Sequence, residues 1–116
     1  MVSAVIAVGR WRLAKRAPFL LALFSLAAVA ATTVDVDIVD YHFNPPTVSI
    51  QVGDSVRWIN GEKRTSHSVL FPAENGLESE RLFPGEEYLR RFEKPGRYPY
   101  RCGPHEEMKG EVVVGE

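Results

Sequence analysis

From residue 33 onward, apolar and polar residues alternate in short runs that end in Gly, Pro or Asn. Alternation with a period of two is typical of strands that bury one face. It predicts strands at residues 34–39, 47–52, 55–60, 66–71, 87–92 and 110–114. Residues 97–102 are also predicted to be extended, with Pro99 restricting them to a sheet edge or an irregular stretch.

The segments between these runs are predicted to be turns and loops. Phe43-Asn44-Pro45-Pro46 is expected to break the chain after the first strand, and residues 72–84, rich in Glu, Gly and Pro, are expected to form a loop. No window supports a helix of three turns. Many short strands with frequent turns predict an all-β fold, an antiparallel sandwich or barrel. The aromatic residues expected in or beside its core are Phe43, Trp58, Phe71, Phe92 and Tyr98.

The first 31 residues have a different pattern. A basic cluster, Arg10 to Arg16, precedes an uncharged run, residues 17–31, that ends in small residues. A basic region, a short apolar region and an Ala-x-Ala site are typical of a secretory signal peptide, and the run is shorter than the roughly 20 residues of a membrane-spanning helix. We therefore expect residues 1–31 to be a signal peptide, cleaved after Ala30 or Ala31, and residues 32–116 to be one domain that is not inserted in a membrane. An uncleaved membrane anchor is the alternative.

Charge and cysteine content narrow the class of protein. The 116 residues carry a net charge of −1. Residues 1–31 contain four cations and no anion, so the rest has ten cations against 15 anions, a net charge of −5. An acidic domain is not expected to bind nucleic acid. A single cysteine excludes an internal disulfide, and an unpaired thiol in an exported protein indicates a specific use.

Metal-binding residue types gather near the end of the chain. Cys102, His105 and Met108 are spaced three residues apart in a loop with Gly and Pro, and His67 lies 35 residues before Cys102. Two histidines and one cysteine in a plane, with a weak axial methionine, are the ligands of mononuclear blue copper sites that transfer electrons. Thiolate and thioether stabilise Cu(I), and imidazole also suits Cu(II). The sequence thus predicts a copper site formed by His67, Cys102, His105 and Met108.

Other interpretations of these residues remain. Each could be an ordinary core or surface residue. This explanation is poor because Cys102, His105 and Met108 all fall within seven residues. Zinc could recruit Glu106 or Glu107 as a fourth ligand, but thioether is a poor zinc ligand. A nucleophilic Cys–His pair is conceivable, yet no third group is evident to orient it. His42, before Pro45-Pro46, is expected to be a surface residue.

The sequence resembles the cupredoxins, the small blue copper proteins, and within them the amicyanins more than the pseudoazurins or plastocyanins. The resemblance covers nearly all of residues 32–116. It depends on Phe43-x-Pro45, on Val52 to Asn60, on His67-Ser68-Val69, on Pro95-Gly96-x-Tyr98-x-Tyr100-x-Cys102 and on Cys102-x-Pro104-His105-x-x-Met108-x-Gly110. The short His105-to-Met108 spacing is the amicyanin-like feature.

This resemblance implies a Greek-key β-sandwich with one copper ion at one end. His67, Cys102 and His105 would be equatorial ligands, Met108 would be axial, and His105 would be the partly exposed electron port. The implied function is a monomeric, periplasmic or secreted one-electron carrier, not an enzyme, and a copper-delivery or storage protein is the alternative. Its partners would be redox proteins: a dehydrogenase as donor, by analogy a methylamine-oxidising one, and a c-type cytochrome as acceptor.

Two departures from the family's pattern bear on function. The residue after the first histidine is often Asn in the family and is Ser68 here, which leaves its bonding to the ligand loop open. The positions after the loop histidine are largely apolar in amicyanin-like proteins and are Glu106 and Glu107 here. Two carboxylates beside the electron port predict a partner with a cationic docking face, or a weak and salt-sensitive encounter. The alternative is that both side chains are simply solvated.

Overall fold

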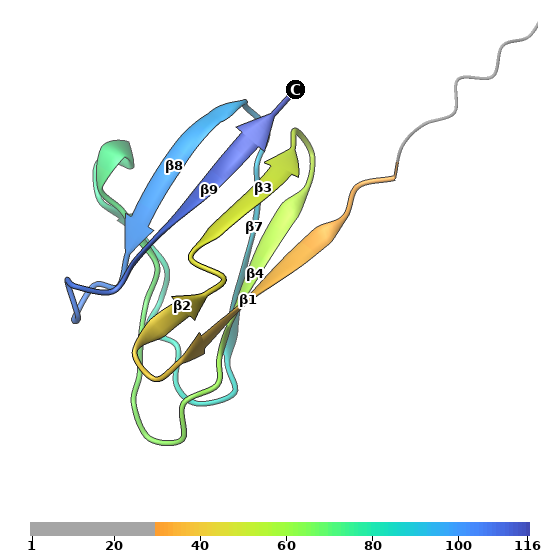
Figure 1. The fold of residues 1–116 in the computed structure, drawn as a ribbon. Helices are drawn as coiled ribbons and strands as arrows, with labels where there is room; N and C mark the ends of the chain where they lie inside the picture. Colours follow the sequence, from red (N-terminus) through yellow and green to blue (C-terminus); the bar gives the residue numbers. More distant parts are fainter. Residues whose placement is uncertain (1–29) are drawn as a thin grey trace, which may run out of the picture.

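The computed structural model describes residues 30–116, which form two β-sheets packed face to face (Figure 1). The strands of the first sheet lie in the order β2-β1-β4-β7 and those of the second in the order β3-β9-β8-β5-β6. The elements are β1 (Thr33–Val39), β2 (His42–Asn44), β3 (Thr47–Gln51), β4 (Ser55–Asn60), β5 (Leu70–Phe71), the short 3-10 helix η2 (Pro72–Glu74), β6 (Leu77–Glu78), β7 (Glu87–Arg91), β8 (Gly96–Arg101) and β9 (Lys109–Gly115). The predicted all-β sandwich is confirmed.

The strand pairing is mixed rather than purely antiparallel. β1 pairs parallel with β4, and β3 pairs parallel with β9, whereas the other ladders are antiparallel. The parallel pairs arise because the chain passes from one sheet to the other between β2 and β3 and returns between β3 and β4. Partners in a ladder are therefore distant in the sequence, an arrangement that alternation within single strands does not reveal.

The core consists of the inward-facing residues of both sheets. In β4, the three residues Val56, Trp58 and Asn60 are buried, and the residues between them are partly exposed. The other buried apolar side chains include Val36, Ile38, Phe43, Val48, Ile50, Val69, Phe71, Phe92, Tyr100, Val112 and Val114. Four of the five aromatic residues expected in the core are buried, and Tyr98 is half-buried against the core.

Several predicted boundaries were wrong. Phe43 does not break the chain: it belongs to β2 and is buried. Of the predicted strand 66–71, only Leu70 and Phe71 form β5, and His67 makes an isolated bridge with Leu82. The predicted loop 72–84 contains η2 and β6. These elements are two or three residues long and depend on tertiary pairing, so periodicity could not define them.

Gly110 in β9 makes a packing prediction possible. A Cβ at this position would overlap the ring and hydroxyl of Tyr100, which is buried in the core and lies opposite Gly110 on β8. We expect Gly110→Ala to destabilise the fold by about 1–3 kcal/mol, as overpacking of a filled core does. Gly115→Ala in the same strand is the control, because its added methyl would have ordinary contacts. Equal urea midpoints for the two variants would contradict this account.

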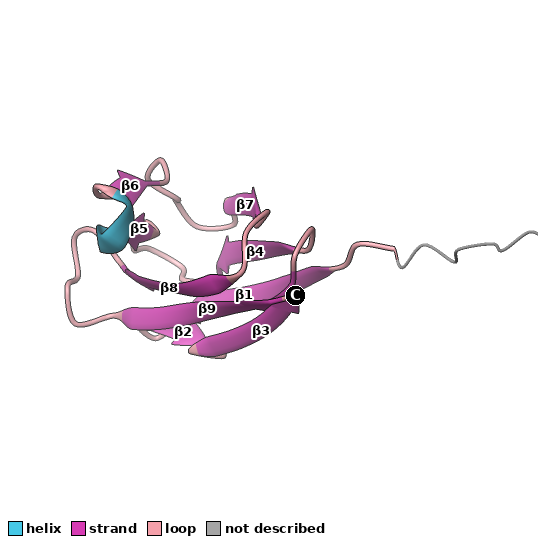
Figure 2. Ribbon diagram, turned by 90° about the horizontal axis from the view of Figure 1, so that it is seen from above, coloured by secondary structure: helices cyan, strands magenta, loops and turns pink. Residues whose placement is uncertain are grey.

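The functional residues identified in the sequence lie at one end of the sandwich. The loop between β8 and β9, the β1–β2 turn and the loop after β4 lie toward the lower end in Figure 1, and the C-terminus lies at the upper end. In Figure 2, β5, β6 and η2 lie beside β8, apart from β2 and β3. Among residues 30–116, no helix is long and apolar enough to cross a membrane. The predicted signal peptide lies outside the described residues except for Ala30 and Ala31.

Candidate metal centre

Three of the predicted ligands meet at this end of the sandwich. In the described part of the chain, His67, Cys102 and His105 form a cluster in which one ligand atom from each lies within 4.8 Å of the others. Cys102 Sγ is 3.6 Å from His67 Nδ1 and 3.5 Å from His105 Nδ1. His67 and Cys102 are fully buried, and His105 is partly exposed.

These distances fit a shared metal ion. Metal–sulfur and metal–nitrogen bonds of roughly 2.3 and 2.0 Å, meeting at about 110–120°, require a sulfur–nitrogen separation of about 3.5–3.7 Å. Both observed separations fall in this range. The cluster contains neither Glu106 nor Glu107, both of which are exposed. The donor set is therefore two imidazoles and a thiol, which suits copper better than a carboxylate-supported zinc ion.

The loop that carries Cys102 and His105 is closed by hydrogen bonds of its own backbone. Cys102 N–H donates to Met108 O at 2.9 Å, and Met108 N–H donates to His105 O at 3.0 Å. At the end of β8, the Arg101 guanidinium donates to the carbonyls of Cys102 and Gly103 at 2.9 and 3.0 Å. The loop is thus fixed at both ends by β8 and β9 and in its middle by these bonds.

His67 is oriented by groups on two other segments. Its backbone exchanges two hydrogen bonds with Leu82, at 3.0 and 2.7 Å. Its Nε2 lies 3.1 Å from a carboxylate oxygen of Glu62. Because this nitrogen donates to the carboxylate, the neutral ring leaves Nδ1 free as a lone-pair donor toward the cluster. A histidine whose outer nitrogen is held by a carboxylate is a common arrangement for metal ligands.

The charges of this pair agree with metal binding. Burial lowers the pKa of His67, although the Glu62 carboxylate opposes this effect. Burial opposes ionisation of Glu62, but hydrogen bonds from Tyr41 N–H and from His67 outweigh it and lower the pKa of Glu62. At neutral pH the pair is therefore a neutral imidazole next to a carboxylate, and neutral imidazole is the form that binds metal.

Tyr41 covers the two histidines, which the sequence did not predict. Its ring makes edge contacts with His67 and His105, at centroid distances of 5.4 and 4.9 Å. Its backbone N–H donates to Glu62 at 2.8 Å, and its hydroxyl lies 3.2 Å from that of Thr65. Tyr41 and Asp40 both have positive φ values, so the β1–β2 turn is tight enough to place this ring over the site.

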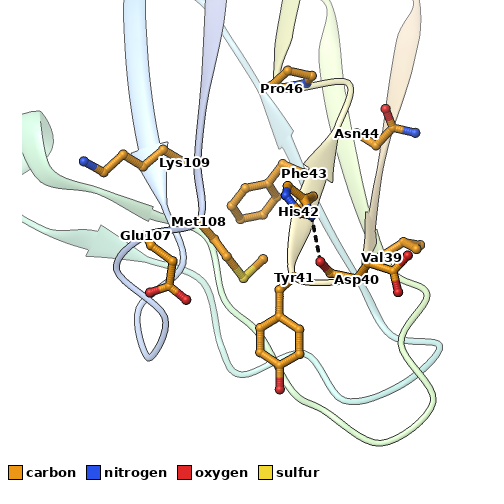
Figure 3. A pocket seen from close by; sticks show the side chains of 10 residues that line it. All are labelled: Val39, Asp40, Tyr41, His42, Phe43, Asn44, Pro46, Glu107, Met108 and Lys109. Carbon is orange, nitrogen blue, oxygen red and sulfur yellow. Dashed lines mark hydrogen bonds between the residues drawn. The ribbon is translucent and has the colours of Figure 1, made fainter.

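Met108 is buried and lines a surface groove beside the ligand loop. The groove is lined by residues of the β1–β2 turn, β2 and the ligand loop. Figure 3 shows the end of the Met108 side chain near Tyr41, and His42 bonded through Nδ1 to Asp40 O. His42 is exposed and lies outside the metal-binding cluster, in line with its predicted surface position.

Ser68 bonds to the ligand loop in spite of its short side chain. Its backbone N–H points at Cys102 Sγ, 3.5 Å away, and its hydroxyl accepts a hydrogen bond from Gly103 N–H at 2.9 Å. The same hydroxyl donates to Glu78 at 2.7 Å. The sequence analysis missed Glu62, Glu78 and Tyr41 because each contacts the site from a segment without a spacing motif. It missed Arg101, which lies next to Cys102, because its bonds to the loop carbonyls depend on the folded conformation of the loop.

A sandwich with a buried Cys–His–His cluster at one end defines a small copper protein of the cupredoxin type, and comparisons with known proteins agree. The sequence pattern described as "Copper binding proteins, plastocyanin/azurin family" matches residues 30–115. The chain is 37% identical over 95 residues to amicyanin of Paracoccus denitrificans, covering 78% of this chain and 72% of that protein. It is 34% identical over 118 residues to chloroplastic plastocyanin of Tetradesmus obliquus, covering 89% and 81%.

Solved structures show the same relationship. The Cu(I) form of an amicyanin point mutant superposes with a TM-score of 0.68 at 37% identity, covering 74% of this chain and 85% of that chain. The chain therefore belongs to the plastocyanin/azurin family of copper-binding proteins. It is a mononuclear copper protein that carries one electron at a time, and it is most similar to the amicyanins among the relatives compared.

Proposed function

We propose that His67, Cys102 and His105 would hold a copper ion and that Met108 would be its fourth and weakest ligand. The observation that carries this proposal is the approach of one thiol and two imidazole nitrogens to within 4.8 Å of one another. Copper supplies a one-electron couple, Cu(II) to Cu(I), whose two states accept this mixed donor set. If the fold holds these ligands in one arrangement in both states, the rearrangement that accompanies electron transfer would be small.

Burial of the site favours an electron carrier over a delivery protein. Cys102 and His67 have no exposed surface, and Met108 is 2% exposed. Copper release through these residues would require the ligand loop to open. In this proposal Cys102 binds the metal and does not act as a nucleophile, so the domain does not transform a substrate.

His105 is the proposed electron port. It is the one residue of the cluster that is not buried, and the exposed ring of Tyr41 lies against it. A partner that docks at this end of the sandwich would approach the copper through the imidazole edge. Redox proteins are the proposed partners, with a dehydrogenase as donor and a c-type cytochrome as acceptor.

Glu106 and Glu107 are proposed to select a cationic docking face. Both are exposed, directly after His105, and within residues 30–116 neither forms an ion pair. Two carboxylates beside the port attract a positively charged partner and increase the rate of encounter at low salt.

The double reversal Glu106→Lys/Glu107→Lys is expected to slow reduction of a basic c-type cytochrome by about tenfold or more at low ionic strength, with the difference shrinking as salt is added. Stopped-flow rates at several salt concentrations measure this. Glu93→Lys/Glu116→Lys is the control, because it changes the net charge equally with two exposed residues. Both follow residues that accept hydrogen bonds from the β3–β4 turn, Phe92 and Gly115, at the end of the sandwich where the C-terminus lies. The ion pair that Glu93 forms with Arg91 is exposed and contributes little. Equal slowing by the two double variants would show that net charge, not the charge beside the port, governs the encounter.

We further propose that the domain, residues 32–116, works outside the cytoplasm after removal of residues 1–31. Ala30 and Ala31 are both exposed and precede β1, which begins at Thr33. Cleavage after either alanine would therefore leave both sheets intact. The mass of the protein recovered from the periplasmic fraction tests this, and a mass that includes residues 1–31 would contradict it.

A further inference from the structure

Glu78, an exposed residue in the two-residue strand β6, is linked to the metal-binding loop by hydrogen bonds. One of its carboxylate oxygens accepts the Ser68 hydroxyl at 2.7 Å. That hydroxyl also receives Gly103 N–H at 2.9 Å. Glu78, Ser68 and Gly103 thus form a chain of hydrogen bonds from β6 to the ligand loop.

The direction of each hydrogen bond follows from the chemistry of the groups. An ionised carboxylate only accepts hydrogen bonds, so the single proton of the Ser68 hydroxyl is donated to Glu78. The lone pairs of that hydroxyl then accept the Gly103 N–H. The hydroxyl has no proton left for Cys102 Sγ, and within residues 30–116 one N–H, that of Ser68, points at this sulfur.

The space around Gly103 shows that Glu78 and the loop fit each other. A Cβ at residue 103 would overlap Glu78 Oε2 and would lie 2.6 Å from Ser68 Oγ. The carboxylate therefore occupies the position that a side chain at residue 103 would need. Gly103 has no positive φ, so its backbone conformation does not require a glycine, and a side chain here would have to displace the Glu78 carboxylate and the Ser68 hydroxyl from their hydrogen bonds.

We propose that Glu78 is a positioning residue for copper. It fixes the Ser68 hydroxyl as an acceptor, which ties the segment of His67 to the loop of Cys102 and His105. It also places a negative charge next to Ser68, the residue whose N–H points at Cys102 Sγ. A negative charge near the site favours Cu(II) over Cu(I) because the oxidised site carries one more positive charge. This proposal rests on the proposed function of Cys102 as the copper ligand.

The first test is the reduction potential of copper-loaded Glu78→Gln. The amide oxygen can still accept from Ser68, but the charge is lost, so the Cu(II)/Cu(I) equilibrium against a fixed mediator is expected to shift toward Cu(I) by about two- to tenfold, tenfold being about 59 mV. Glu80→Gln is the matched control, because Glu80 is exposed nearby and its side chain makes no hydrogen bond to the loop. Equal shifts in the two variants, or a shift toward Cu(II) in Glu78→Gln, would overturn the proposal.

The second test is a double-mutant cycle with urea unfolding as its readout. If Glu78 acts through Ser68, Glu78→Ala should raise the equilibrium constant of unfolding severalfold in the parent chain and have little further effect after Ser68→Ala. Additive effects would overturn the proposed coupling. Absence of the blue absorption band in the parent protein would instead contradict the assignment of Cys102, so the two failures are distinguishable.

Discussion

Replacing Cys102 by serine is expected to abolish the intense absorption near ~600 nm and to weaken copper binding by more than about 100-fold. The thiolate is the one sulfur anion available to the cluster, and the band arises from its bond to Cu(II). A serine hydroxyl is similar in size but is protonated at neutral pH and binds copper poorly. Absorption spectra and competition with a chelator of known affinity measure the two effects.

His42→Ala is the control for this prediction. His42 is the one histidine of the chain that lies outside the cluster, and it is exposed on the rim of the groove. Its replacement should leave the band and the copper affinity unchanged within about twofold. A blue band that survives in Cys102→Ser, or that is lost in His42→Ala, would contradict the proposed ligand set.

Arg90→Ala is expected to cost about 2–4 kcal/mol of stability, a large share of what a domain of this size has. Arg90 of β7 is partly buried and forms two hydrogen bonds of 2.8 Å with Glu74 of η2. Its guanidinium also lies 4.5 and 4.4 Å from the ring centres of Phe71 and Phe92. Truncation removes the cation–π contacts and leaves the Glu74 carboxylate without its partner.

Arg97→Ala is the control for this prediction, and the pH dependence of stability provides a second measurement. Arg97→Ala removes another arginine in an ion pair, but the Arg97 side chain is 71% exposed, so a change below about 0.5 kcal/mol is expected. The hydrogen bond from Arg90 lowers the pKa of Glu74. The stability that this hydrogen bond provides is therefore complete above the pKa of Glu74 in the unfolded chain, about 4.3. It is lost as the pH falls through the lower pKa of Glu74 in the folded protein. Glu74→Gln should show a flatter acid profile, and a parallel one would contradict this account.

The sequence predicted most long strands of this fold to within a residue or two. In β4, alternation is strict because one face packs on the core and the other is partly exposed. The prediction was weakest where pairing is short: His67 was placed at the start of a strand, whereas it makes a single bridge to Leu82. The environment of His67 is set by a long-range contact, which a local pattern does not encode.

The chemistry of the candidate site was predicted better than its surroundings. Cys102, His105 and Met108 share one loop, so their spacing alone indicated a site. Glu62 and Glu78 bond to His67 and Ser68 from separate loops and strands. Exposed or partly exposed acidic residues are common, so the sequence offered no reason to single out these two. They became evident only when the folded chain placed each carboxylate within hydrogen-bond distance of the segment that carries His67.

The departure at residue 68 shows how structure resolves an ambiguity of sequence. Serine is shorter than the asparagine often found at this position in the family, and the bond to the ligand loop was therefore in question. The hydroxyl reaches Gly103 N–H at 2.9 Å, in space that a Cβ at residue 103 would crowd. The short residue at position 68 and the glycine at position 103 thus form one packing arrangement.

Titration of the domain, residues 32–116, with Cu(II), followed by ascorbate, is the most direct test of a one-electron copper site in this protein. We expect an intense band at about 600 nm that saturates at one copper per chain and bleaches when the reductant is added. Reoxidation should restore the band, since the ligands serve both oxidation states. Weak absorption, binding of Cu(I) alone, or saturation at a different stoichiometry would contradict a mononuclear carrier site formed by His67, Cys102, His105 and Met108.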